Sequence, residues 1–199
     1  NGMFPARSNE RMAALRVDHR IANGHTAFLR YAHDNVTSIR NNLSPQSDSS
    51  QVDTFSRAHS AVSELGSSLS SRVLNTLRAH WFTHTSGGVP HARDGTPGIQ
   101  RPSVSTGLTV GGDWQTLSRT RVVVSDTLYV SGGNHDMRVG GEAAFGTHEL
   151  DAHFFEDGFF VFRTDAPFDP RSPVTWPTSF QVQAPNSQTY TARQFAAFV

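Results

Sequence analysis

Residues 119–130, RTRVVVSDTLYV, are joined to residues 135–145, HDMRVGGEAAF, through the turn Gly132-Gly133-Asn134. In the second segment, apolar residues at positions 137, 139, 143 and 145 alternate with charged residues at positions 136, 138 and 142. A two-residue period is typical of a β-strand with one apolar face and one polar face. Glycine and asparagine between two such segments favour a tight turn. The stretch therefore predicts a β-hairpin of two long strands.

Two more hairpins of this kind are predicted in the first half of the chain. Residues 11–21 reach His25 through Asn23-Gly24, a pair that favours a type I′ turn because both central positions of that turn need a positive φ. Residues 58–69 reach Val73 through the serine-rich turn 70–72. Long polar gaps separate the hairpins, at about residues 35–57, 86–118 and 147–188. Short turns at one edge and long loops at the other are the layout of a membrane-spanning β-barrel.

Charged side chains occupy only one of the two faces along residues 13–20 and in three further predicted strands. In residues 11–21, Leu15 and Val17 share one face, whereas Arg16 and Asp18 share the other. In a barrel the charged side would face a water-filled lumen. The charged residues that we expect there are Arg16, Asp18, Arg20, Arg30, Arg78, Arg138 and Glu142.

Two carboxylates depart from this alternation. Glu64 has the same parity as Val62, and nothing in the pattern of residues 58–69 explains it. Asp126 has the parity of Val124, but it lies toward the short-turn end of its strand. We therefore expect the Asp126 carboxylate to reach headgroups or water.

Strand length separates a soluble sheet from a membrane-bound one. A soluble β-rich binding or adhesin module is the main alternative, because it would show the same alternation. The predicted strands of about 10–12 residues exceed those of soluble sheets and match the length that crosses a bilayer at a tilt. Tyr31 and Trp81 also lie toward the long-loop ends of their strands, where an aromatic girdle would meet the membrane surface.

We therefore predict an all-β fold, an antiparallel up-and-down meander of about six or seven long strands. It is expected to form part of a transmembrane β-barrel with short periplasmic turns and long extracellular loops. A mean hydropathy of -0.42 suits a soluble protein and a strand-built membrane protein equally. No apolar run is long enough for a transmembrane helix, so any membrane-spanning elements must be strands. Equal numbers of basic and acidic residues, 17 of each, give no support for nucleic-acid binding.

Four stretches resemble the barrel of TonB-dependent outer-membrane receptors, and most closely the Oar-like branch, whose members carry an N-terminal carboxypeptidase-regulatory-like domain. The first consists of DTL (126–128) with GNHDMRVGGE (133–142). The others are LRVDHRI with HTAFLRY (15–21 and 25–31), LNTLR (74–78) and QFAAFV (194–199), all in the family's order. The chain departs from the family's pattern in three ways. Arg138 stands where the family has a lysine, Thr76 stands where it has a glutamate, and the last motif ends before the QDdW part that follows it in the family.

This resemblance implies a large barrel closed by a separate plug domain, in the outer membrane of a Gram-negative bacterium. It implies import of a scarce ligand, of unknown identity, when the TonB-ExbB-ExbD system pulls on the plug. The partners would be outer-membrane lipid, that system and the ligand, with no nucleic acid, no cofactor and no enzymatic activity. Residues 1–199 are expected to be a partial barrel domain, a fragment without plug, TonB box or signal peptide.

Gly133-Asn134-His135-Asp136 supports a third hypothesis, because calcineurin-like metallophosphoesterases bind metal through a GNH[DE] run. Such a site also needs a DxH before this run, since its two metals share bridging carboxylates. The DxH of this chain, at residues 151–153, follows the run instead. A tight turn explains the same residues, so a metallophosphoesterase fragment is the weaker alternative. Four residues separate His80 from His84, about 13 Å along a strand, which is too far for one metal ion.

Aromatic residues are concentrated in the longest polar gap. On an extracellular loop they would either contact a ligand or pack the loop against its neighbours, and we favour packing. The residues are Phe154, Phe155, Phe159, Phe160 and Phe162.

Overall fold

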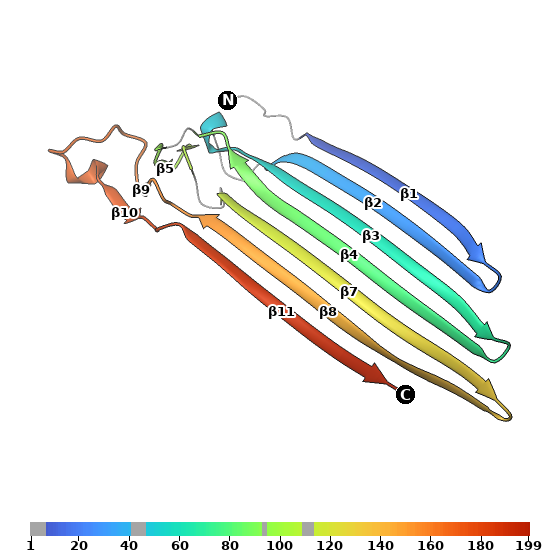
Figure 1. The fold of residues 1–199 in the computed structure, drawn as a ribbon. Coiled ribbons are helices and arrows are strands. Elements are labelled where there is room, and N and C mark those ends of the chain that lie inside the picture. The colour runs from blue at the N-terminus through green and yellow to red at the C-terminus, as the bar shows by residue number, and fades with distance from the viewer. Residues whose placement is uncertain (1–6, 41–46, 93–94, 109–113) are drawn as a thin grey trace.

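The computed structural model describes residues 7–40, 47–92, 95–108 and 114–199. Its main body is a seven-stranded antiparallel sheet with the strand order β1-β2-β3-β4-β7-β8-β11. The strands are β1 (Ser8–Ala22), β2 (His25–Arg40), β3 (Val52–Ser70), β4 (Val73–Pro90), β7 (Trp114–Gly132), β8 (His135–His153) and β11 (Asn186–Phe198). Figure 1 shows the short turns at one end of the strands and the long connections at the other end. We call these two ends the short-turn edge and the long-loop edge of the sheet. The predicted all-β, up-and-down meander is confirmed. In the described part of the chain, no helix has the length and apolar character needed to cross a membrane.

The strands are longer than the sequence pattern indicates. β3, β7 and β8 each contain 19 residues, and β1, β2 and β4 contain 15, 16 and 18. The prediction of about 10–12 residues per strand is therefore wrong, and the long gaps are shorter than expected. The reason is that a strand outside the hydrocarbon can be polar on both faces. Its alternation then ends before its hydrogen-bond ladder does.

The first and third short turns differ in type. Gly24 has a φ of 83°, Asn23 has no positive φ, and the register slips by one residue between Arg20 and Ala22. The prediction of a type I′ turn at Asn23-Gly24 is therefore wrong, and the hairpin has a one-residue irregularity in β1 just before the turn. In the β7–β8 turn, Gly133 has a φ of 62° and is the first of two central residues, as in a type II′ turn.

The strands are staggered so that they tilt. The row of paired residues that contains His25, the first residue of β2, crosses β3, β4 and β7 and reaches Val139 of β8. Val139 is four residues inside β8, which begins at His135. The short-turn edge is thus displaced by about one residue per strand. With ~3.3 Å per residue and ~4.8 Å between strands, this stagger corresponds to a tilt of about 35°, as in transmembrane β-barrels.

The two faces of the sheet differ in chemistry. The apolar face carries Leu15, Val17, Leu29, Trp81, Val124 and Phe145, as the cross-strand pairing shows. The charged face carries Arg16, Arg30, Glu64, Arg78 and Glu142. Side chains of the apolar face are exposed, Leu15 at 66% and Phe195 at 73%. A large exposed apolar surface is unfavourable in water, so lipid is the environment that this face fits.

The apolar zone ends near the middle of the strands on the long-loop side. Tyr31 and Trp81 lie in one row of paired residues, and the next row toward the long loops contains His33, His59 and Thr83. The Tyr31 hydroxyl lies 2.6 Å from His59 Nδ1 in that polar row. The two aromatic residues therefore border the apolar zone, although they are not at the strand ends as expected. About 12 tilted residues cross ~30 Å of hydrocarbon, so the remainder of each long strand extends the sheet beyond the membrane.

Asp126 lies within the apolar face, between Leu77 of β4 and Gly141 of β8. It is six residues from Gly132, the end of β7, which corresponds to about 20 Å along the strand. Its carboxylate Oδ1 accepts a hydrogen bond of 2.8 Å from Asn75 Nδ2. A neighbouring amide thus partners one oxygen of this carboxylate, and the expected contact with headgroups or water stays a prediction.

The long connections form a second sheet, which we call the loop sheet. Its strands are β5 (Gly98–Gln100), β6 (Ser105–Thr106), β9 (Phe159–Phe162) and β10 (Pro177–Gln181), in the order β10-β9-β5-β6. The 3₁₀ turns η1 (Asp48–Ser50) and η2 (Pro173–Thr175) lie in the same connections. Figure 1 shows these elements beside the long-loop ends of the main strands. Phe159 of the loop sheet is buried at 1% exposure, and so are two residues at the long-loop ends of main strands, Ala152 of β8 at 1% and Val52 of β3 at 3%.

Candidate functional site

The charged face is the candidate functional surface, because the polar side of a transmembrane barrel faces its lumen. The strand register places all of the predicted charged residues on this one face, from β1, β2, β4 and β8. They are Arg16, Asp18, Arg20, Arg30, Arg78, Arg138 and Glu142. Contact of these residues with an imported ligand stays a prediction.

Ion pairs and ring contacts hold several of these side chains near the short-turn edge. Arg16 Nη2 lies 2.7 Å from Asp18 Oδ1, two residues along β1. The Arg16 guanidinium also lies 4.3 Å from the ring centre of Phe28 on β2. Both charges of the pair are exposed and screened by water, so its contribution to stability is small. The pair thus fixes the positions of these two exposed side chains on the charged face.

Arg138 makes contacts of another kind. Its guanidinium lies 5.4 Å from the ring centre of Tyr129 on β7 and 5.0 Å from that of Phe198 on β11. Cation–π contacts of this kind contribute about 0.5–1 kcal/mol at exposed sites. Arg138 therefore links three neighbouring strands of the sheet.

Glu64 is explained by the register. It lies on the charged face between Phe28 of β2 and Arg78 of β4, and its Oε2 is 2.5 Å from Arg78 Nε. Val62 shares this face, so β3 has an apolar residue on the charged side. The sequence signal was present in the hairpin, because Glu64 and Arg78 are equally far from the 70–73 turn once its one-residue slip is counted.

Toward the long-loop edge the charged face becomes basic. Arg119 of β7 pairs directly with His84 of β4 on one side and with His148 of β8 on the other. Arg121 follows two residues along β7 on the same face. We call His84, Arg119, Arg121 and His148 the basic patch. Sequence reasoning did not find it, because residue 148 was expected in a loop rather than in a strand beside Arg119.

His91 lies just beyond the end of β4, between two carboxylates. Its Nδ1 is 3.2 Å from Asp48 Oδ1, and its Nε2 is 3.1 Å from Asp53 Oδ1. The hydrogen bond to Asp53 raises the pKa of His91 most, and that to Asp48 adds to it, against the lowering effect of partial burial. Protonated His91 therefore links η1 to the start of β3.

The predicted loop aromatics gather around β9. Phe159 is buried, with the Phe155 ring centre 5.0 Å from its own. The ring centres of Phe160 and of Phe180 on β10 are 4.7 Å apart. The other two, Phe154 and Phe162, are partly buried. These contacts involve neighbouring loop segments, and contact with a ligand stays a prediction.

The run from Gly133 to Asp136 closes a hairpin. His135 pairs with Gly132 and Asp136 pairs with Ser131, so both potential metal ligands are the first residues of β8. Within the described ranges, no three His, Asp or Glu side chains are grouped closely enough to hold a metal ion. The turn interpretation accounts for this run.

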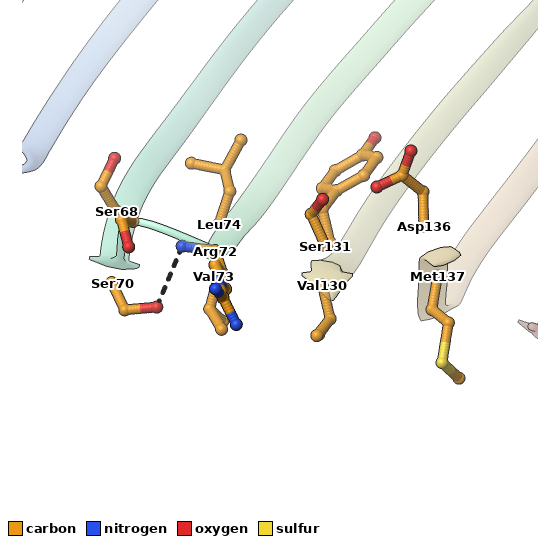
Figure 2. A pocket seen from close by; sticks show the side chains of 11 residues that line it. Ser68, Ser70, Arg72, Val73, Leu74, Val130, Ser131, Asp136 and Met137 are labelled. Carbon is orange, nitrogen blue, oxygen red and sulfur yellow. Dashed lines mark hydrogen bonds between the residues drawn. The ribbon is translucent and has the colours of Figure 1, made fainter. Parts of the chain in front are cut away.

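A hollow of about 510 Å³ lies at the short-turn edge, between the β3–β4 and β7–β8 turns. Figure 2 shows Leu74 and Asp136 pointing to one side of the strands and Met137 to the other. The two turns are joined there, because Ser131 N–H donates to the Arg72 carbonyl oxygen at 2.8 Å. Since both faces of the sheet bound the hollow, it is a notch between two turns rather than an enclosed site.

A tilted antiparallel sheet with an exposed apolar face and an opposite charged face defines a strand-built transmembrane protein. Residues 3–198 match the family described as the outer membrane beta barrel domain. The chain belongs to this family and is located in the outer membrane of Gram-negative bacteria, where its environment is membrane lipid. The soluble β-rich module is thereby excluded. No curated protein and no solved structure matches the chain.

Proposed function

We propose that the protein is a TonB-dependent outer-membrane receptor that takes up a scarce ligand, and that residues 1–199 form part of its barrel wall. The observation that carries this proposal is the occurrence of four receptor-like motifs, in order, within an outer-membrane barrel domain. The motifs fall on the β1–β2 hairpin, on β4, on the β7–β8 hairpin and at the end of β11. They thus coincide with strands and short turns, where a barrel family has least freedom to vary in length.

The charged face supports uptake through a wide, hydrated lumen. Small residues lie between its charges, among them Ala14, Ala32, Gly146 and Ala196. Such a surface leaves room for water and for a second body inside the barrel. A plug held by the remaining polar groups of this wall, and moved by TonB, fits that space. The protein would then transport its ligand without enzymatic chemistry.

The loop sheet fits the role of an outer entrance. The connection between its strands β9 and β10 presents apolar side chains to solvent, with exposed fractions of 55% for Phe168, 69% for Val174 and 47% for Trp176. The turn that carries them is held internally, because Thr175 Oγ1 accepts from Asp169 N–H at 2.9 Å and Trp176 Nε1 donates to the Asp169 carbonyl at 3.2 Å. A preorganised apolar turn loses little conformational entropy when it contacts a ligand.

The proposal is tested with the protein encoded by the complete reading frame. We expect it to contain a plug domain and, in detergent, to bind the periplasmic domain of TonB in surface plasmon resonance. Deleting its gene and deleting the tonB gene should produce the same growth defect on some limiting nutrient. A complete protein without a plug, or one that fails to bind TonB, would contradict the proposal.

A further inference from the structure

We infer that the basic patch, His84, Arg119, Arg121 and His148, binds an oxyanion group, carboxylate or phosphate, of the imported ligand. This inference rests on the proposed uptake function, and it adds the chemical class of the ligand. The patch lies on the charged face near the long-loop edge, which an entering ligand would reach first.

The patch concentrates nitrogen donors at neighbouring positions of one face. Arg119 has His84 and His148 as its cross-strand neighbours, at the ~4.8 Å spacing of adjacent strands. Arg121 follows on the same face of β7, ~6.6 Å along the strand from Arg119. Two guanidinium groups this close together favour the approach of a negative group from outside the sheet. Both arginines are exposed on this face and accessible to such a group.

Carboxylates of the same face are distant from the patch. Asp34 of β2 lies in the same row of paired residues as His84 of β4, with β3 between them. Glu142 lies on β8, the strand next to Arg121, four residues along from the partner of Arg121. These separations are about 10 Å and about 14 Å. Within the described ranges neither Arg119 nor Arg121 has an ion pair, in contrast to Arg16 with Asp18 and Arg78 with Glu64.

Hydroxyl groups adjoin the patch. A hollow of about 390 Å³ is lined by Ser38, Thr54, Ser56, Ser86 and Gln115, among others. Ser56 Oγ lies 3.0 Å from His84 Nε2, which connects the hollow to the patch. Hydroxyl donors beside a guanidinium are the groups that bind carboxylate and phosphate oxygens, because arginine offers two parallel N–H donors to such a group. Charge and hydrogen-bond donors thus point to the same ligand chemistry.

Titration calorimetry on the complete protein in detergent tests this inference. Pyrophosphate is the phosphate probe, tricarballylate is the carboxylate probe, and raffinose is the neutral probe. We expect at least one anion to bind and raffinose not to bind. The variant Arg119→Gln/Arg121→Gln should bind that anion about 100-fold more weakly, because two charge-assisted hydrogen bonds are lost. Arg119→Lys/Arg121→Lys keeps both charges and should retain most of the affinity.

The matched control is Arg11→Gln/Arg163→Gln, which removes two exposed positive charges outside the patch and should change the affinity less than about twofold. A folded wild-type protein that binds neither anion would overturn the inference, as would equal affinity in the wild type and the glutamine variant. The inference would also be overturned if, without any added anion, the glutamine variant had a lower unfolding temperature than the wild type. Carboxylates of the protein itself would then neutralise the patch. Arginine-dependent anion binding without TonB binding would contradict the uptake proposal and leave this site standing.

Discussion

Glu64 of β3 and Arg78 of β4 are direct cross-strand partners on the charged face, with Arg78 Nε 2.5 Å from Glu64 Oε2. The Arg78 side chain is 63% exposed and that of Glu64 is 25% exposed. The pair therefore marks the charged face as hydrated, because ions of this kind are not held in a dry core without further partners.

We expect Glu64→Gln to lower the free energy of unfolding by less than about 1 kcal/mol, because water screens the exposed arginine. Urea unfolding of the protein in lipid vesicles measures the change. A double-mutant cycle with Arg78→Gln isolates the pair, and Glu10→Gln on β1 is the control. A coupling energy above about 2 kcal/mol would instead indicate a desolvated pair and contradict a hydrated face.

Val124 and Ser125 are adjacent in β7 but lie on opposite faces of the sheet. We expect Val124→Arg to destabilise the protein by about 2–4 kcal/mol, because it places a charge in the hydrocarbon. Ser125→Arg should change stability by less than about 1 kcal/mol, because its two cross-strand neighbours on the hydrated charged face, Glu142 and Arg78, have opposite charges whose effects offset each other. Vesicle-based urea unfolding compares the two, and equal costs would contradict the assignment of faces.

Two adjacent glycines of the β7–β8 turn differ only in backbone conformation. Gly133 has a φ of 62°, whereas Gly132 has no positive φ, and a methyl group added to either would meet no atom within 4 Å. Gly133→Ala should therefore cost about 1 kcal/mol of stability, through backbone strain alone. Gly132→Ala is the matched control, with little or no loss. A larger loss at Gly132 would show that the turn has another conformation.

The contact of His91 with Asp48 and Asp53 should depend on pH. Because the pKa of His91 is raised in the folded protein, its stabilising effect is complete below its ordinary pKa near 6.5 and is lost as pH rises through the higher folded value. The His91 amide donates to the Gln51 carbonyl at 2.9 Å. Its hydrogen-exchange protection, corrected for intrinsic rates, should fall as pH rises through that window.

Asp53→Asn removes the largest contribution to this shift, so it should move the transition to lower pH. Asp165→Asn, elsewhere in the long connections, is the control and should leave the transition in place. Protection of the His91 amide that rises with pH would contradict the assigned role of the two carboxylates.

Sequence reasoning predicted the meander, its short turns and its charged face because a half-apolar strand has a strict two-residue period. It did not predict strand ends, since the period vanishes where both faces meet water, as beyond Tyr31. It also missed the partners of Glu64 and Asp126, which are set by cross-strand register rather than by the chain's own period. The basic patch escaped because residue 148 lies where the two-residue period has vanished, so it was expected in a loop rather than opposite Arg119. The loop sheet joins residues 98–100 with 159–161 in parallel, a long-range pairing that local patterns do not encode.

The central claim is that one face of the sheet contacts lipid and the other contacts water. The chain contains no cysteine, so single cysteines can be introduced at Val122, Val123, Val124 and Ser125 of the membrane-inserted protein. A membrane-impermeant maleimide should label positions 123 and 125 rapidly and positions 122 and 124 slowly. Equal labelling at all four positions, or the opposite parity, would contradict the account.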